Sequence, residues 1–169
     1  MNGIAFLGTV LAAAATPVSA HPDQPLATKP TAATQGAAAT EQEAVKRVLS
    51  DYKAAIERRD ARGTEQLFVA DSSVFESGGS EGTYANYLTH HLGPELDEFR
   101  AFQFSDYKVD MHLLSADAAH AIETYKFRIE TKAGEVVDRL GVATSVLRKE
   151  HGTWKIVMMH SSSRRPKAS

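Results

Sequence analysis

The chain has 169 residues, no cysteine and a formal net charge of -2, with 43% hydrophobic and 24% charged residues. This length suits a single domain of ordinary size. The lack of cysteine rules out disulfides, thiolate metal sites and a cysteine nucleophile. The near-neutral charge gives no basic face of the kind that nucleic-acid binding requires, so we expect no nucleic-acid partner.

The first 40 residues differ from the rest, because they contain 12 of the 26 alanines but only two of the 40 Asp, Glu, Lys and Arg residues. An apolar stretch from Ile4 to Ala15 is shorter than the roughly 20 residues that a membrane-spanning helix needs. Val18 and Ala20 then fill the small-residue positions of an A-x-A-like cleavage site. We expect a signal peptide over 1–20 and a periplasmic or secreted protein with no membrane insertion after cleavage. The alternative is a disordered alanine-rich N-terminus, since no Lys or Arg precedes the apolar stretch.

Residues 21–40 are rich in Pro, Ala, Thr and Gln and lack the apolar side chains that offset chain entropy. This composition predicts a flexible linker. We expect the folded domain over 41–163 and a short basic tail over 164–169.

Helical signals come first in the expected domain. A capping-box pattern, Thr40-x-x-Glu43, precedes apolar residues at helical spacing and predicts a long helix; these residues are Val45, Val48, Leu49, Tyr52 and Ile56. Asp60 is expected to begin a short second helix that carries Leu67 and Phe68. Thr83 is expected to begin a third helix that runs to about Leu92 and ends at Gly93-Pro94.

Strand signals follow. Val74 to Glu76 is a brief strand signal, and Ser77 to Ser80 has loop composition. From Ala101 the apolar residues alternate with polar ones, and a change of phase at Ser105-Asp106 predicts a bulge. Long strands are then expected over 118–131, 136–148 and 154–162. Helices followed by an antiparallel meander predict an α+β fold in which the helices cover one face of the sheet.

Two segments resemble the nuclear transport factor 2-like superfamily, which includes SnoaL-like cyclases and ketosteroid isomerases. They are LFVADSSVFESGG at 67–79 and GTWKIVMMHSS at 152–162, and the resemblance extends over about 41–163, closest to a bacterial branch of unassigned activity. It implies a cone-shaped half-barrel, with N-terminal helices packed in a strongly curved antiparallel sheet around an open pocket. It also implies a homodimer formed through the outer sheet face. Because this superfamily hosts enzymes, binding modules and assembly domains, the fold does not decide the function.

Two residues are candidates for catalysis. His160 is expected on the same strand face as Trp154 and Met158, where an imidazole could act as an acid or a base; the alternative is a half-buried structural histidine. Glu76 ends a strand signal at the expected mouth of the pocket, where a carboxylate beside aromatic residues could move a proton; the alternative is a solvated loop acid.

Further polar candidates lie on the third helix and in the strands. In the stripe Tyr84, Tyr87, Leu88 and His91, periodicity turns His91 inward, although either His90 or His91 is a candidate because helix ends fray. One of this pair, together with Glu76 and His160, could bind a divalent metal, but a helix-terminal pair is the favoured interpretation and we assign no metal or cofactor.

The superfamily resemblance suggests roles for tyrosines. Ketosteroid isomerases pair an acidic base with an oxyanion hole of Tyr and a protonated Asp. Tyr52 and Tyr125 are the candidates for such a donor here, whereas no Asp matches the position of the acid.

The expected pocket is largely apolar and binds a small apolar or amphipathic molecule. Its apolar lining is expected from Tyr52, Phe75, Trp154, Ile156 and Met158. Arg139 lies in phase with the small residues of its strand and could meet an anionic ligand, although an interface ion pair is favoured. The leading hypothesis is a ligand-binding module. The alternatives are a cyclase or isomerase with a Glu/His proton shuttle, and an assembly or accessory domain.

Overall fold

The structure, a computed structural model, describes residues 32–167. The expected signal peptide and the linker up to residue 31 lie outside the described residues, so both stay predictions. Within 32–167, no helix combines the length and the apolar character that crossing a membrane requires.

The first helix, α1, spans Ala32–Arg58 and begins earlier than the sequence indicated. Residues 32–40, expected in the linker, are helical, and alanine, the strongest helix former, dominates that stretch. The predicted capping box is therefore wrong: the hydroxyl of Thr40 donates to the carbonyl of Gly36 inside the helix, at 3.1 Å. The predicted apolar stripe is confirmed, since Val45, Leu49 and Ile56 are buried in the core.

A short 3-10 helix, η1 (Thr64–Leu67), leads directly into strand β1 (Phe68–Glu76). Phe68 thus belongs to a strand rather than to the expected second helix. A tight turn then joins β1 to β2 (Gly79–Gly82), with positive φ at Ser77 (48°) and Gly78 (92°). Two successive left-handed residues form the turn type that suits a two-residue hairpin, where the sequence had indicated only a loop.

The third helix has three parts, α2 (Tyr84–Tyr87), η2 (Leu88–Leu92) and α3 (Gly93–Glu98). Thr83 caps it as predicted, by accepting the backbone N–H of Asn86 at 3.3 Å. The expected end at Gly93-Pro94 is wrong, because η2 is a π-helical turn in which the N–H of Gly93 bonds to the carbonyl of Leu88. A β-carbon on residue 93 would lie 2.6 Å from that carbonyl oxygen, so the turn requires glycine. Pro94 occupies the first turn of α3, where its missing N–H costs nothing.

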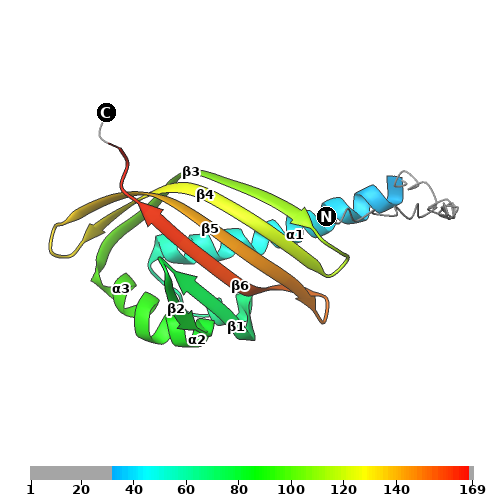
Figure 1. The fold of residues 1–169 in the computed structure, drawn as a ribbon, viewed down its shortest axis with the longest axis horizontal. Helices are drawn as coiled ribbons and strands as arrows, with labels where there is room; N and C mark the ends of the chain where they lie inside the picture. Colours follow the sequence, from blue (N-terminus) through cyan, green and yellow to red (C-terminus); the bar gives the residue numbers. More distant parts are fainter. Residues whose placement is uncertain (1–31, 168–169) are drawn as a thin grey trace, which may run out of the picture. The chain divides into compact units, whose positions relative to one another are not determined.

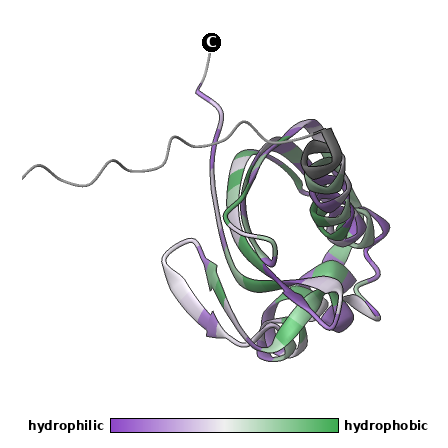
Figure 2. Cartoon of the chain, turned by 90° about the vertical axis from the view of Figure 1, so that its right-hand side faces the viewer, coloured by the Kyte–Doolittle hydropathy of each residue, from purple (hydrophilic) through white to green (hydrophobic). Residues whose placement is uncertain are grey.

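Four long strands complete the fold: β3 (Phe99–Leu113), β4 (Ala118–Thr131), β5 (Val136–Glu150) and β6 (Thr153–Arg164). The sheet order is β2-β1-β6-β5-β4-β3, and all neighbours are antiparallel except β1 and β6, which are parallel. The predicted α+β class is confirmed. The sheet curves around α1 without closing on itself (Figures 1 and 2).

Two bulges set which side chains face the helices. In β3 the pairing shifts between Ser105 and Lys108, and Asp106 has a φ of 52°, which confirms the predicted bulge. In β6 the pairing with β5 shifts after Ile156, so that Val157 is an extra residue. A bulge of one residue exchanges the two faces of the strand beyond it. Ile156 and Met159 therefore both point inward and are buried.

Candidate functional site

A cavity of about 290 Å³ lies between α1, α2–α3 and the concave face of the sheet. Its lining is mainly aromatic, with contributions from Tyr52, Tyr87, Phe99, Phe102, Phe104, Tyr107, Tyr125 and Phe127. Three carboxylates, two cations and the serines at the end of β6 also line it. An apolar cavity with a few convergent polar groups is typical of a small-molecule site.

The strand register arranges the inner face of the sheet in rows. One row joins Glu76 of β1, Ser161 of β6, Ala143 of β5 and Glu123 of β4. The rows on one side of it are buried; they include Val74–Met159–Ser145–Ala121, of which only Met159 also lines the cavity. The rows on the other side begin with Ser163–Gly141–Tyr125, in which Ser163 and Tyr125 line the cavity. The row with the two glutamates therefore forms the boundary between core and cavity.

Glu76 lies at one end of this row, beside the third helix. The hydroxyl of Tyr87 donates to its Oε2 at 2.6 Å, and Nε2 of His91 lies 3.9 Å from the same oxygen. Within residues 32–167, Oε1 of Glu76 has no hydrogen-bond partner, and 30% of the side chain is exposed. One carboxylate oxygen is therefore anchored, while the other remains available to a bound molecule.

His91 connects Glu76 to two more carboxylates. Its Nδ1 lies 3.1 Å from Oε2 of Glu81, and its Nε2 lies 3.3 Å from Oε1 of Glu95. Burial lowers the pKa of His91, but the hydrogen bond to Glu81 and the charges of Glu95 and Glu76 outweigh burial and raise that pKa overall. The imidazolium form is thus favoured, and its charge offsets part of the negative charge around Glu76.

Glu123 lies at the other end of the row and is 8% exposed. The hydroxyl of Tyr107 donates to its Oε1. Burial raises the pKa of Glu123, and the hydrogen bond from Tyr107 offsets only part of that rise. Glu123 therefore holds its proton more readily than a carboxyl group in water does.

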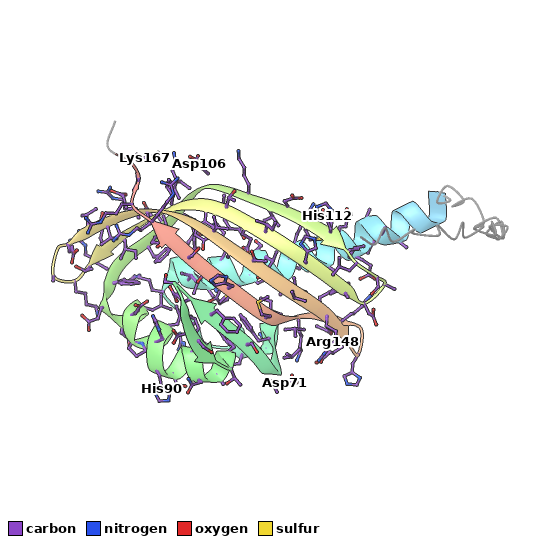
Figure 3. The ribbon with its side chains drawn as sticks, in the orientation of Figure 1. Asp71, His90, Asp106, His112, Arg148 and Lys167 are labelled. Carbon is purple, nitrogen blue, oxygen red and sulfur yellow. The ribbon has the colours of Figure 1, made fainter. Side chains whose placement is uncertain are left out.

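The structure brings together four of the predicted site residues, because Tyr52, Glu76 and Tyr125 line the cavity and His91 lies against Glu76. The inward orientation of His91 agrees with the helical stripe. His90 is exposed and points away from the fold (Figure 3).

The other predicted site residues lie elsewhere. His160 is exposed on the outer face, where its ring contacts Phe75, which is 38% exposed. The expected inward placement of His160 and Met158 fails because the bulge at Val157 exchanges the faces of β6. Phe75 also faces outward, because successive residues of a strand point to opposite faces and its neighbour Val74 is buried on the inner face. Trp154, which is 3% exposed, and Ile156, which is fully buried, belong to the core rather than to the cavity lining.

Sequence reasoning missed Glu123, although a signal was present. The residue shares the phase of Ala119, Ala121 and Tyr125, which form the apolar face of the strand. An acidic residue on an otherwise apolar strand face marks a buried carboxylate, and such groups concentrate at functional sites.

No metal centre is formed by the residues described. Among residues 32–167, no group of three His, Asp or Glu side chains is arranged to hold a metal ion. His160, one of the proposed ligands, lies on the opposite face of the sheet from Glu76.

Solved structures with the same fold are numerous. The hexachlorocyclohexane dehydrochlorinase LinA-type3 from Novosphingobium barchaimii is 14% identical, with a TM-score of 0.67 over 78% of this chain and 91% of that one. A nuclear transport factor 2-like protein from Salmonella enterica is 20% identical, with a TM-score of 0.68 over 78% and 96%. A scytalone dehydratase candidate from Novosphingobium aromaticivorans is 18% identical, with a TM-score of 0.65 over 78% and 89%. The search of curated proteins gave no match.

These likenesses establish the fold and leave the activity open, because all three identities are low. The model of the SnoaL-like domain matches residues 45–166, which covers β1 to β6 and the second half of α1. The chain therefore belongs to the SnoaL-like domain family, within the nuclear transport factor 2-like fold.

Proposed function

We propose that this protein is an acid–base enzyme that transfers a proton on a small, mainly apolar molecule, in an isomerisation or an elimination. The observation that carries the proposal is the row in which Glu76 and Glu123 both face the cavity with small residues between them. Three strand spacings separate the two residues, about 14 Å along the sheet surface and less across the curve. A molecule seated over Ala143 and Ser161 would lie between two carboxyl groups.

The two groups suit opposite roles. Oε1 of Glu76 is available to accept a proton from carbon, while Tyr87 holds Oε2. Glu123 is buried and its pKa is raised, so of the two it suits the donor role toward an oxygen or a leaving group. Enzymes that shift protons commonly place an acid and a base in environments that separate their pKa values. Two of the structural neighbours carry the names dehydrochlorinase and dehydratase, and both names denote eliminations.

The second candidate function is binding without chemistry. The predominance of aromatic residues in the cavity lining favours it, because such a surface holds an apolar molecule without a catalytic group. Under this alternative, Glu76 and Glu123 only orient the ligand.

Ring opening of nitrobenzisoxazole tests the catalytic proposal without knowledge of the natural substrate. This small aromatic probe opens to a coloured phenolate when a base removes one C–H proton. We expect wild-type protein to accelerate the reaction and Glu76→Gln to lower the rate about tenfold or more, since a positioned base typically contributes 10²- to 10⁴-fold.

Glu65→Gln is the matched control, because Glu65 is exposed on η1 and does not line the cavity. It should retain the wild-type rate. A wild-type rate no higher than that of acetate buffer would refute catalysis. Binding of a neutral apolar dye by the same protein would then support the binding module.

A further inference from the structure

Arg139 lies on the inner face of β5, in the part of the cavity beyond the row of glutamates. Its cross-strand partner is Phe127 on β4, and both residues line the cavity. Arg139 is half-buried as a residue, and its guanidinium donates to the carbonyl of Asp138 at 3.0 Å. This is its one hydrogen bond within the described part of the chain, and four of its five N–H groups remain free.

Within residues 32–167, the charge of Arg139 has no counter-charge. Among residues 32–167, no carboxylate lies within 4.0 Å of its guanidinium. The other cavity cation, Lys53, has a counter-charge, because its Nζ lies 2.7 Å from Oε2 of Glu57. Arg128, on the outer face of the same pair of strands, lies 3.0 Å from Oδ2 of its cross-strand partner Asp138. The inner arginine has an aromatic ring where the outer one has a carboxylate.

A half-buried arginine without a counter-charge does not stabilise a fold, because no ion pair repays the partial desolvation of its side chain. Placed in a ligand cavity, the same group suits a bidentate contact with a carboxylate, sulfonate or phosphate. The aromatic lining beside it suits the apolar body of a ligand.

Resting on the proposed function, we propose that the molecule processed in this cavity carries an anionic group and that Arg139 binds it. Arg139 precedes Ala143 by four residues on β5, about 13 Å along the strand. The ligand is therefore elongated and amphipathic, with its anionic end at Arg139 and its reacting carbon at the row of Glu76. This orientation also keeps the anion away from the carboxylates around His91.

Two dyes with a shared aromatic skeleton test the inference. Anilinonaphthalene sulfonate carries one anionic group, whereas phenylnaphthylamine is the same skeleton without it. For Arg139→Gln we expect the Kd of the sulfonate to rise about tenfold or more and that of the neutral dye to change by less than about twofold, as a charge-assisted contact predicts. The unfolding midpoint should not fall, whereas a structural role for Arg139 would lower it.

Matched variants separate the possible outcomes. Arg128→Gln, which removes a positive charge from the outer face, should leave both Kd values unchanged. Ala143→Phe fills the cavity at the glutamate row and should abolish binding of both dyes; Ser161→Leu serves the same purpose if the first variant does not fold. Equal losses for both dyes, or no loss, in Arg139→Gln would overturn the inference and leave the catalytic proposal to the Glu76→Gln test. If wild type bound neither dye, or if filling the cavity changed nothing, the cavity would not be the ligand site and both proposals would fall.

Discussion

Gly141→Ala is the sharpest test of how the wall of the cavity is built. Gly141 lies opposite Tyr125 in the strand register, and the tyrosine ring covers it. A β-carbon on residue 141 would lie 2.1 Å from Cε2 of Tyr125, 2.7 Å from Cδ2 and 2.8 Å from Cζ. Gly141 has no positive φ, so the backbone itself accepts alanine without strain. The expected loss of stability in Gly141→Ala therefore comes entirely from the clash with the ring.

The expected magnitude is the difference between two opposing terms. Alanine at a compatible strand position stabilises by about 0.5–1 kcal/mol relative to glycine. Overpacking a well-packed site costs about 1–3 kcal/mol. The ring of Tyr125 can move into the adjoining cavity, which limits the cost, so we expect a net loss of about 1–2 kcal/mol. For a domain of this size, the unfolding temperature would fall by about 2–8 °C.

Urea unfolding, followed by circular dichroism and by the fluorescence of the single tryptophan, measures the effect. The double-mutant cycle with Tyr125→Ala isolates the clash, because that variant removes the ring atoms that the new methyl group meets. In the Tyr125→Ala background, Gly141→Ala should stabilise by about 0.5 kcal/mol. An equal destabilisation in both backgrounds would refute the reasoning, since the penalty would then arise in the backbone.

Two further substitutions test the raised pKa of Glu123 and the outward orientation of His160. Because burial raises the pKa of Glu123, its contribution to stability is fully present below the unfolded value near 4.5 and is lost as pH rises through the folded pKa. Glu123→Gln should therefore flatten the decline of the free energy of unfolding above that pH, and an unchanged pH profile from urea unfolding would contradict this. His160→Ala should leave nitrobenzisoxazole turnover at the wild-type rate because His160 faces outward; a large loss would show that the outer face of β6 takes part in the reaction.

Much of the fold was predictable because period and turn chemistry are local. Alternation identified β4 from Ala118 to Thr131, and the break in phase at Ser105-Asp106 located the bulge of β3. The parallel pairing of β1 with β6 was not predictable, since only tertiary contacts bring these distant segments together. The continuation of the third helix through Pro94 was not predictable either, because it depends on the π-helical turn that precedes it.

The site was predictable in part. Helical periodicity correctly turned His91 inward, and the strand signal before the glycine loop correctly drew attention to Glu76. Strict alternation along β6 predicted the wrong face for His160, because it takes no account of the bulge at Val157. No glycine or proline in the sequence marks that bulge. Glu123 was missed because the alternation was used to find apolar residues, and its one acidic member was not weighed.

The row that joins Glu76 and Glu123 also separates two parts of each strand that have different roles. On β4, the inward residues before Glu123 are alanines buried in the core, whereas those after it, Tyr125, Phe127 and Ile129, line the cavity. Substitutions after Glu123, in the distal half of the strand, can therefore adapt the cavity to a new ligand. The residues before Glu123, in the proximal half, keep the domain folded. A library confined to the distal rows should be rich in folded variants with altered specificity, and one confined to the proximal rows should be rich in unfolded chains.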